Sequence, residues 1–197
     1  MGPKIGVLAL QGDFEAHLEA LAREGIAGEE VRYPAQLELL DGLILPGGES
    51  TTHLKLLEER GLGEALAHFH ARGGALFGTC SGAILIAAGV SGPAQPSLGF
   101  LDIDIERNAF GRQMDSFEAA ARIPGLGDEP LEMIFIRAPR IRRVGPRVEV
   151  LATWQGEPVL VRESRVMAGT FHPELSGDGR IHRLFAGVAA SEGRSPS

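Results

Sequence analysis

The 197-residue chain has a single cysteine, Cys80, so no disulfide bond can form within it. Composition leaves this cysteine two interpretations, a small buried apolar residue or a reactive thiol, and by itself favours the buried one. Lysine and asparagine are also scarce, with two lysines against seventeen arginines and one asparagine. That bias carries no information about function.

Excess positive charge and long apolar runs are lacking as well. No apolar run approaches the roughly 20 residues that a membrane-spanning helix requires, and the start of the chain is not typical of a cleaved signal peptide. The formal net charge is −7, which argues against a broad nucleic-acid surface, because phosphate binding needs a concentrated basic face. We therefore expect a cytoplasmic protein that binds neither membrane nor nucleic acid.

What is present fits one globular domain. The sequence is 44% hydrophobic and 23% charged, as in ordinary soluble proteins, and its length suits a single domain. We see no internal repeat and no linker. We expect one domain over residues 1–190, followed by a disordered tail over 191–197.

The first half of the chain alternates short apolar runs with amphipathic segments. The apolar runs are typical of strands buried on both faces, and the segments between them have helical periodicity. Strands that alternate with helices imply a parallel sheet covered on both faces. The predicted strands are 5–10, 31–33, 42–45 and 75–77, and the predicted helices are 13–25 (with Asp13 as its cap), 50–59, 63–71 and 83–88.

The second half is richer in strands. Leu101, Ile103 and Ile105 alternate with acidic residues, which predicts a half-exposed strand, and residues 155–158 look like a hairpin turn. The fold class is therefore α/β, with three layers, a mostly parallel central sheet between helices, and a smaller antiparallel portion. The other strands predicted are 133–136, 148–153, 159–161 and 166–171, before a last helix at 181–190.

Residues 78–82 read Gly-Thr-Cys-Ser-Gly between a predicted strand and a predicted helix. In that context two glycines permit a sharp turn that presents the middle side chain, here Cys80, above the sheet. The helix N-terminus behind it favours a thiolate, and the backbone N–H of Ser81 can stabilise an oxyanion. The alternative is a glycine-rich packing turn with an inert cysteine.

Gly47 and Gly48 follow another buried strand. Glycines there allow the backbone to approach a ligand and expose its N–H groups, so the N–H of Gly48 is a candidate second oxyanion donor. Taken alone, the pair is more often an ordinary strand-to-helix loop. It is not a phosphate-binding P-loop, because no Gly-Lys-Ser or Gly-Lys-Thr follows.

His172 and Glu174 follow the predicted strand 166–171. The carboxyl ends of parallel strands gather ligands, so this histidine can meet Cys80 there. A histidine can take the thiol proton and return it to a leaving amine, and a nearby carboxylate can hold its tautomer. We assign no metal site to the other histidines, which all lie on predicted helices: His17, His53, His68, His70 and His182.

Six short stretches together resemble the class I glutamine amidotransferases, which have a flavodoxin-like fold, and within them the glutaminase subunit of the deoxyxylulose-independent pyridoxal 5'-phosphate synthase. The resemblance runs from about residue 4 to residue 188. Its only departure at the cysteine turn is Ser81, where alanine is frequent, and serine keeps the backbone N–H. The stretches are 10–12, 45–50, 78–82, 106–113, 135–139 and 171–174.

The resemblance implies a mechanism and a partner. Cys80 is the expected nucleophile, with His172 and Glu174 completing a triad that hydrolyses L-glutamine without metal or organic cofactor. Ammonia is expected to pass to a synthase subunit, and Gln11 resembles part of a loop facing that subunit. Residues implied to bind glutamine are Gly48, Glu49, Ser50, Arg107, Ile136 and Arg137.

Several alternatives remain open on the residues alone. Without the resemblance, Arg107 would be interpreted as part of a surface salt bridge, and Arg112 and Arg137 as structural. The protein as a whole has three rival interpretations: a glutaminase serving another acceptor, a cysteine hydrolase or peptidase of similar fold, and a non-catalytic module with Cys80 as a redox sensor.

Overall fold

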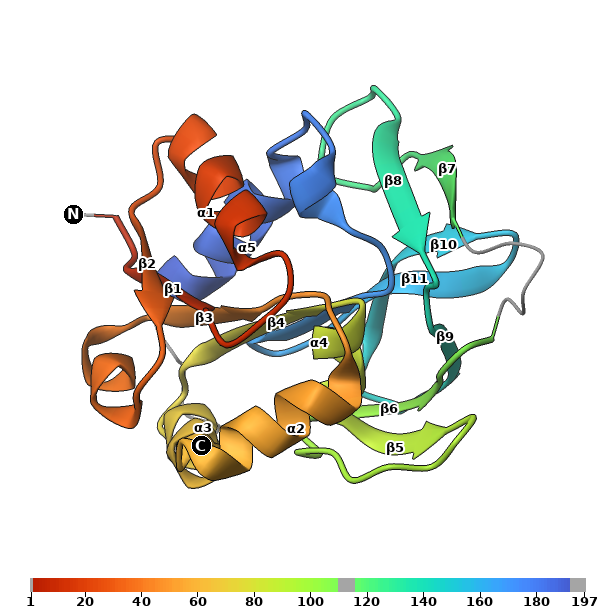
Figure 1. Cartoon of the computed structure of the whole chain (residues 1–197). Helices are drawn as coiled ribbons and strands as arrows, with labels where there is room; N and C mark the ends of the chain where they lie inside the picture. Colours follow the sequence, from red (N-terminus) through yellow and green to blue (C-terminus); the bar gives the residue numbers. More distant parts are fainter. Residues whose placement is uncertain (1, 110–115, 192–197) are drawn as a thin grey trace.

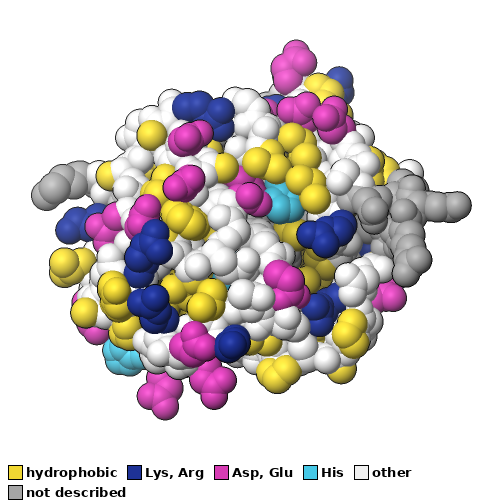
Figure 2. Space-filling model, in the orientation of Figure 1, with side chains coloured by type: hydrophobic (Ala, Val, Ile, Leu, Met, Phe, Trp, Pro, Cys, Tyr) yellow, Lys and Arg dark blue, Asp and Glu magenta, His cyan; other side chains and the backbone are white. Residues whose placement is uncertain are grey.

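The structure is a computed structural model that describes residues 2–109 and 116–191 (Figure 1). Arg112 and residues 192–197 of the expected tail lie outside the described residues. No helix among those described is long and apolar enough to cross a bilayer. Basic and acidic side chains are interspersed over the described part of the face in Figure 2, rather than gathered in one basic patch.

The core of the fold is a seven-stranded sheet with the order β10-β11-β12-β4-β3-β1-β2. Five neighbouring strands, β12 to β2 in that order, are parallel, and β11 and β10 extend the sheet with antiparallel pairs. The order 2-1-3-4 is that of flavodoxin-like folds. The strands are β1 Ile5–Leu8, β2 Gly28–Val31, β3 Gly42–Leu45, β4 Ala75–Thr79, β10 Glu149–Trp154, β11 Glu157–Glu163 and β12 Val166–Gly169.

Helices cover both faces of this sheet, which gives the three predicted layers (Figure 1). One face packs against α1 and α5 through Leu21 and Phe185. The other packs against α2, α3 and α4 through Leu57, Leu66 and Ile84. The helices are α1 Phe14–Arg23, α2 Ser50–Glu59, α3 Leu62–Ala71, α4 Ser81–Ile86 and α5 Arg180–Ala190, with 3-10 turns η1 Pro34–Leu39 and η2 Pro173–Leu175.

Two smaller sheets complete the fold. β6 (Leu101–Glu106) has the predicted alternation, buried then half-buried, and its outward carboxylates pair with arginines of β9, as Asp104 does with Arg143 at 2.7 Å. β6 is antiparallel to β9 and parallel to β5, so this sheet is mixed. The remaining strands are β5 Ala87–Ser91, β9 Arg140–Val144, and the antiparallel pair β7 Ser116–Ala121 and β8 Leu131–Ile136.

Several predicted elements are wrong in their bounds, and the strand expected at 166–171 stops at Gly169. The helix expected at 83–88 ends at Ile86, because Ala87 is extended and begins β5. The strand expected at 31–33 is β2, an exposed edge strand at Gly28–Val31 whose two glutamates hid it from a hydrophobicity pattern. The strand expected at 5–10 stops at Leu8. Strands β5, β7 and β9 were not predicted.

Candidate active site

Strand pairing brings the cysteine turn beside the histidine segment. β4 and β12 are parallel neighbours, with Thr79 opposite Gly169, so Cys80 and the chain leading to His172 leave the sheet at the same edge. The N–H of Cys80 donates to the carbonyl of Gly169 at 2.8 Å, which fixes the two ends together. The site therefore lies at the carboxyl ends of the parallel strands, where ligands bind in open α/β sheets.

The turn that carries Cys80 has a strained backbone. Cys80 has φ 49° and ψ −106°, a region that costs a residue with a side chain about 1–3 kcal/mol. A Cβ added at Gly78 would lie 2.5 Å from the backbone carbonyl carbon of Gly82, and one added at Gly82 would clash with the backbone carbonyl of Leu45, so neither position has room for a side chain. The predicted strand-turn-helix context is confirmed, and α4 begins at Ser81 directly after the cysteine.

His172 and Glu174 form a buried pair beside this turn. The Nδ1 of His172 lies 2.7 Å from Oε1 of Glu174, and both residues are only 3% exposed. The N–H of His172 donates to the carbonyl of Ile134 on β8 at 2.8 Å, which anchors the segment. A Cβ added at Gly47 would lie 2.5 Å from Cε1 of His172, so the twin-glycine loop packs directly on the imidazole ring.

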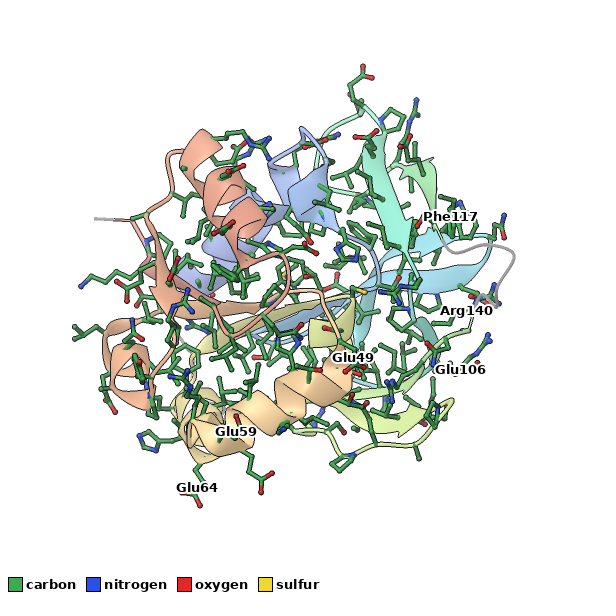
Figure 3. The ribbon with its side chains drawn as sticks, in the orientation of Figure 1. Glu49, Glu59, Glu64, Glu106, Phe117 and Arg140 are labelled. Atoms are coloured by element: carbon green, nitrogen blue, oxygen red, sulfur yellow. The ribbon has the colours of Figure 1, made fainter. Side chains whose placement is uncertain are left out.

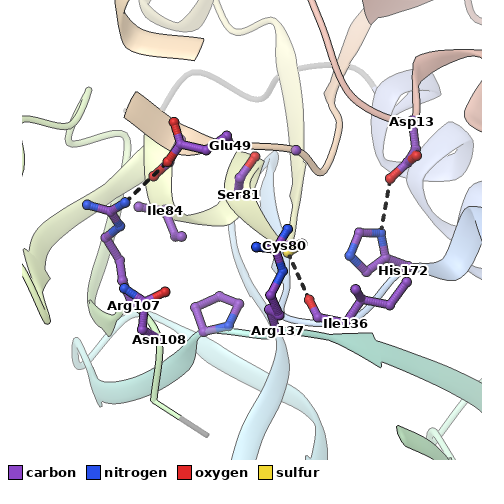
Figure 4. Close-up of a pocket in the computed structure, with 13 residues that line it drawn as sticks. Asp13, Glu49, Cys80, Ser81, Ile84, Arg107, Asn108, Ile136, Arg137 and His172 are labelled. Carbon is purple, nitrogen blue, oxygen red and sulfur yellow. Dashed lines mark hydrogen bonds and ion pairs between the residues drawn. The ribbon is translucent and has the colours of Figure 1, made fainter. Parts of the chain in front are cut away.

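The charge on His172 follows from its partners. Burial lowers the pKa of His172, but hydrogen bonds to Cys80 and Glu174, together with their negative charges, outweigh it and raise the pKa to about 10. An imidazolium between a thiol group and a carboxylate is the arrangement that activates cysteine nucleophiles. The Sγ of Cys80 also lies 3.9 Å from the carbonyl oxygen of Ile136, a weak contact visible in Figure 4.

The loop that contains Gly48 is held in place by the side chain of Gln11, a contact that the sequence did not predict. Gly48 has φ 140°, a conformation that favours glycine. The side chain of Gln11 donates to the carbonyl of Glu49 at 2.9 Å and accepts from its N–H at 3.3 Å. Gln11, which the resemblance assigns to a loop facing a partner subunit, therefore also fixes the position of the Gly48 loop through these hydrogen bonds.

Ser81 links the cysteine turn to the same loop. Its hydroxyl donates to the carbonyl of Pro46 at 3.4 Å and lies 3.2 Å from Nδ1 of the buried His53. Ser81 is 2% exposed. The hydroxyl at this position therefore ties the start of α4 to the end of β3 and to α2, a role beyond that of its backbone N–H.

A cavity of about 170 Å³ opens over Cys80 (Figure 4). Every residue that the sequence predicts for substrate binding or for the oxyanion hole borders it, and so do Cys80 and His172, whereas Glu174 lies buried behind His172. Sequence reasoning gave no site role to four lining residues, of which Asn108 and Pro139 lie within the stretches that carry the resemblance: Asp13, Ile84, Asn108 and Pro139.

One wall of the cavity carries an ion pair. Arg107 Nη2 lies 3.4 Å from Oε1 of Glu49, with the arginine side chain 11% and the glutamate 52% exposed. Glu49 directly precedes α2 (Figure 3). Burial raises the pKa of Glu49, but the hydrogen bonds from Thr51 and Thr52 together outweigh it and lower the pKa to about 2. The wall therefore offers both a cation and an anion, which suits a zwitterionic amino acid.

Asp13 is the N-cap residue of α1, as predicted, but its side chain makes no cap hydrogen bond. Its Oδ2 lies 3.6 Å from Nδ1 of His172 instead (Figure 4). Asp13, His172 and Glu174 are the one group among the described residues whose ligand atoms are close enough to hold a metal ion. A metal there would take the His172 nitrogen away from Glu174. The expected absence of a metal stays a prediction.

Comparison with known proteins places this arrangement in a family. A model of the SNO glutamine amidotransferase family matches residues 7–190. The pyridoxal 5'-phosphate synthase subunit PdxT of Deinococcus radiodurans is 55% identical, over 94% of this chain and 96% of that protein. The protein of the same name from Thermotoga maritima is 50% identical, over 92% of this chain and 97% of that protein.

Solved structures agree with the sequence comparison. A crystal structure described as a glutamine amidotransferase superposes with a TM-score of 0.89 at 51% identity, covering 95% of this chain and 99% of that one. A glutamine amidotransferase of Thermotoga maritima superposes with a TM-score of 0.61 at 11% identity, covering 95% of each chain. At that identity the second match shows the fold alone, and it confirms the predicted fold class.

Proposed function

Because the chain belongs to the SNO glutamine amidotransferase family, we propose that it releases ammonia from L-glutamine through a thioester on Cys80. It is the glutaminase subunit of a pyridoxal 5'-phosphate synthase, given its identity of 55% and 50% with two subunits of that name over more than nine-tenths of its length. The observation that carries the catalytic proposal is the buried His172–Glu174 pair beside Cys80 in a cavity bordered by Gly48 and Arg107.

The first half of the reaction transfers the glutamyl group to sulfur. The thiolate of Cys80 attacks the side-chain carbonyl carbon of glutamine, and the N–H groups of Gly48 and Ser81 stabilise the resulting oxyanion. His172, protonated at the start, gives its proton to the departing nitrogen as the C–N bond breaks. Ammonia leaves, and a γ-glutamyl thioester remains on Cys80.

The second half returns the enzyme to its starting state. His172, now neutral, takes a proton from water, whose oxygen attacks the thioester carbon. The C–S bond breaks, glutamate departs, and the thiolate and imidazolium are restored. Glu174 keeps Nδ1 of His172 protonated throughout, so that Nε2 is the atom that exchanges protons.

The cavity wall supports glutamine as the substrate. Arg107 provides a cation for the substrate carboxylate and Glu49 an anion for its ammonium group. Ser50, Ile136 and Arg137 border the same space. With the charged end of glutamine held at this wall, its neutral side-chain amide can reach Cys80.

The partner is inferred from the relatives, which are subunits of a pyridoxal 5'-phosphate synthase. A synthase subunit receives the ammonia directly, because ammonia released into water at neutral pH is mostly protonated and no longer nucleophilic. Gly47 and Gly48 suit a loop that rearranges when the partner docks, since glycine tolerates a peptide rotation at low cost. The cytoplasmic location expected from the sequence stays a prediction.

Glutamine hydrolysis, measured with and without the synthase subunit, tests this function. We expect turnover to rise when the synthase is added and to be abolished by Cys80→Ala. Equal rates with and without the synthase would contradict the coupling, and activation by a different acceptor enzyme would make this a glutaminase of another pathway. Turnover retained in Cys80→Ala, or hydrolysis of peptides in place of glutamine, would contradict the chemistry.

A further inference from the structure

The buried polar chain of the site continues past Glu174. His17 on α1 and His182 on α5 are both 0% exposed. The Nε2 of His17 lies 3.3 Å from Oε2 of Glu174, and its Nδ1 lies 3.0 Å from Nε2 of His182. Sequence reasoning gave neither histidine a role. A line of polar groups therefore runs from the cavity through His172 and Glu174 into the helix layer formed by α1 and α5.

The contacts select one set of tautomers. Glu174 Oε2 accepts no hydrogen bond of good geometry among the described residues, and His182 Nδ1 has no partner there either. If His17 carried its proton on Nδ1, its Nε2 lone pair would face the carboxylate at 3.3 Å, and His182 would bury an unpaired N–H. With both protons on Nε2, His182 donates to His17, and a polar N–H of His17, rather than a lone pair, lies beside the carboxylate of Glu174.

Thr79 ties this arrangement to the nucleophile. Its hydroxyl lies 3.1 Å from the same Nε2 of His17, so the Nε2–H makes its hydrogen bond with Thr79, and its contact with Oε2 of Glu174 at 3.3 Å is electrostatic. Thr79 is the last residue of β4 and directly precedes Cys80. The position of His17 is thereby fixed relative to both ends of the triad.

Both histidines are neutral at neutral pH. Burial lowers the pKa of His17, although Glu174 opposes this, and burial followed by the neighbouring His17 lowers the pKa of His182 to about 3. The other ionisable groups that act on this pair are Asp13, His172 and Arg23. A neutral donor holds a carboxylate in place without cancelling its charge, so the negative charge of Glu174 stays available to His172.

We propose that His17 is a positioning residue of this glutaminase: its Nε2–H, set by His182 behind it, fixes the carboxylate of Glu174 and through it the orientation and basicity of His172. The inference rests on the proposed function, because it assigns His172 as the proton-transfer group. It adds two buried histidines to the catalytic apparatus, neither of which touches the cavity.

The first test uses the unmodified chain and needs no turnover. Nitrogen NMR of the six histidine side chains distinguishes the two neutral tautomers and the imidazolium. At pH 7.5 we expect Nε2–H tautomers at His17 and His182 and an imidazolium at His172. An Nδ1–H tautomer at His17 would overturn the proposal, because a lone pair cannot hold the carboxylate.

The second test removes the donor and then restores it. His17→Leu deletes the N–H, whereas His17→Gln can place an amide N–H near the Nε2 position. Measured with the synthase subunit, His17→Leu should lower kcat at least tenfold with KM within twofold, and should lower the NMR titration midpoint of His172 by one pH unit or more. His17→Gln should recover at least half of each change on a logarithmic scale.

A control variant separates a specific role of His17 from a general effect of losing a histidine. His70→Leu alters a half-buried histidine of α3 that stacks on Phe100, away from the cavity, and should change neither kcat nor the His172 titration. A folded His17→Leu with kcat within twofold of wild type, or equal losses in the Leu and Gln variants, would overturn the proposal. If His17→Leu does not fold, the tautomers of the wild-type protein and the kcat and His172 titration of His17→Gln test the proposal in its place. Loss of the proposed function would appear separately, as absent turnover in the wild type.

Discussion

Acid should destabilise this protein well before its carboxylates protonate, because it buries neutral histidines. Burial lowers the pKa of His53 to about 4 and that of His182 to about 3, against about 6.5 in an unfolded chain. Such groups lower the stability as pH falls below 6.5, since the unfolded state then binds more protons. His17, whose pKa burial also lowers, acts in the same direction.

The size of the effect follows from these values. Between pH 7 and pH 5 each of these imidazoles binds most of a proton in the unfolded chain but remains neutral in the folded one. This difference lowers the free energy of unfolding by about 2 kcal/mol for each of His53 and His182. His172 acts in the opposite direction. Its pKa of about 10 means that it stabilises the folded state, and this contribution reaches its full size only below pH 6.5. Between pH 7 and pH 5 it therefore adds about 1 kcal/mol to the free energy of unfolding. The free energy of unfolding should therefore fall by at least about 3 kcal/mol.

Urea unfolding at pH 7 and pH 5 measures this difference. The single tryptophan, Trp154, stacks on Phe117 with ring centroids 4.5 Å apart (Phe117 is labelled in Figure 3), so its fluorescence should report loss of packing. His182→Gln should reduce the fall by about 2 kcal/mol, whereas His68→Gln on the exposed side of α3 should leave it unchanged. Stability that is constant or higher at pH 5 would refute the reasoning.

Three further outcomes follow from the site. Gly47→Ala places a Cβ 2.5 Å from Cε1 of His172 and should lower kcat at least tenfold in a folded protein. Gly63→Ala, which has open space around its Cβ, should leave kcat unchanged. Equal kcat values for the two variants would contradict the packing of the Gly47 loop on the imidazole ring. Arg107→Leu should raise KM for glutamine about tenfold, the loss of roughly 1.4 kcal/mol of binding, with a smaller change in kcat; an unchanged KM would return Arg107 to a surface salt bridge. Dialysis against EDTA should leave turnover unchanged, and a loss restored by Zn²⁺ would mean that Asp13, His172 and Glu174 bind a metal.

Much of the site was predictable because its motifs lie at strand ends. Cys80 and His172 follow β4 and β12, and a parallel sheet brings such ends to one edge whatever the rest of the chain does. The twin-glycine loop after β3 converges on them for the same reason. Local pattern and topology therefore predicted that Cys80, His172 and the twin-glycine loop meet, whereas Arg107, Ile136 and Arg137 were assigned to the site only through the family resemblance.

What was missed depends on tertiary contacts that no local pattern encodes. Gln11 braces the loop of Gly48 through two hydrogen bonds that span 38 residues of sequence. Asp13 looked like a helix cap, but its side chain points at His172. His17 is separated by 165 residues from the histidine it contacts.

The fold was missed where secondary structure follows neighbours rather than composition. β5 continues an apolar run that looked helical, and it becomes a strand only because β6 pairs with it. β7 combines a glutamate with small alanines and gains its order from pairing with β8 and from the Phe117–Phe135 stack. β9 is largely arginine, paired with the carboxylates of β6.

The nature of the covalent intermediate is the most direct test of the central claim. Acid quenching of the complex during glutamine turnover, followed by mass spectrometry of the peptide that contains Cys80, should reveal a fraction heavier by one glutamyl group, labile to hydroxylamine. Because this is the only cysteine of the chain, a thioester can form nowhere else on it. Steady turnover with Cys80 unmodified at every quench time, and with no trapping by a glutamine-analogue electrophile, would contradict the account.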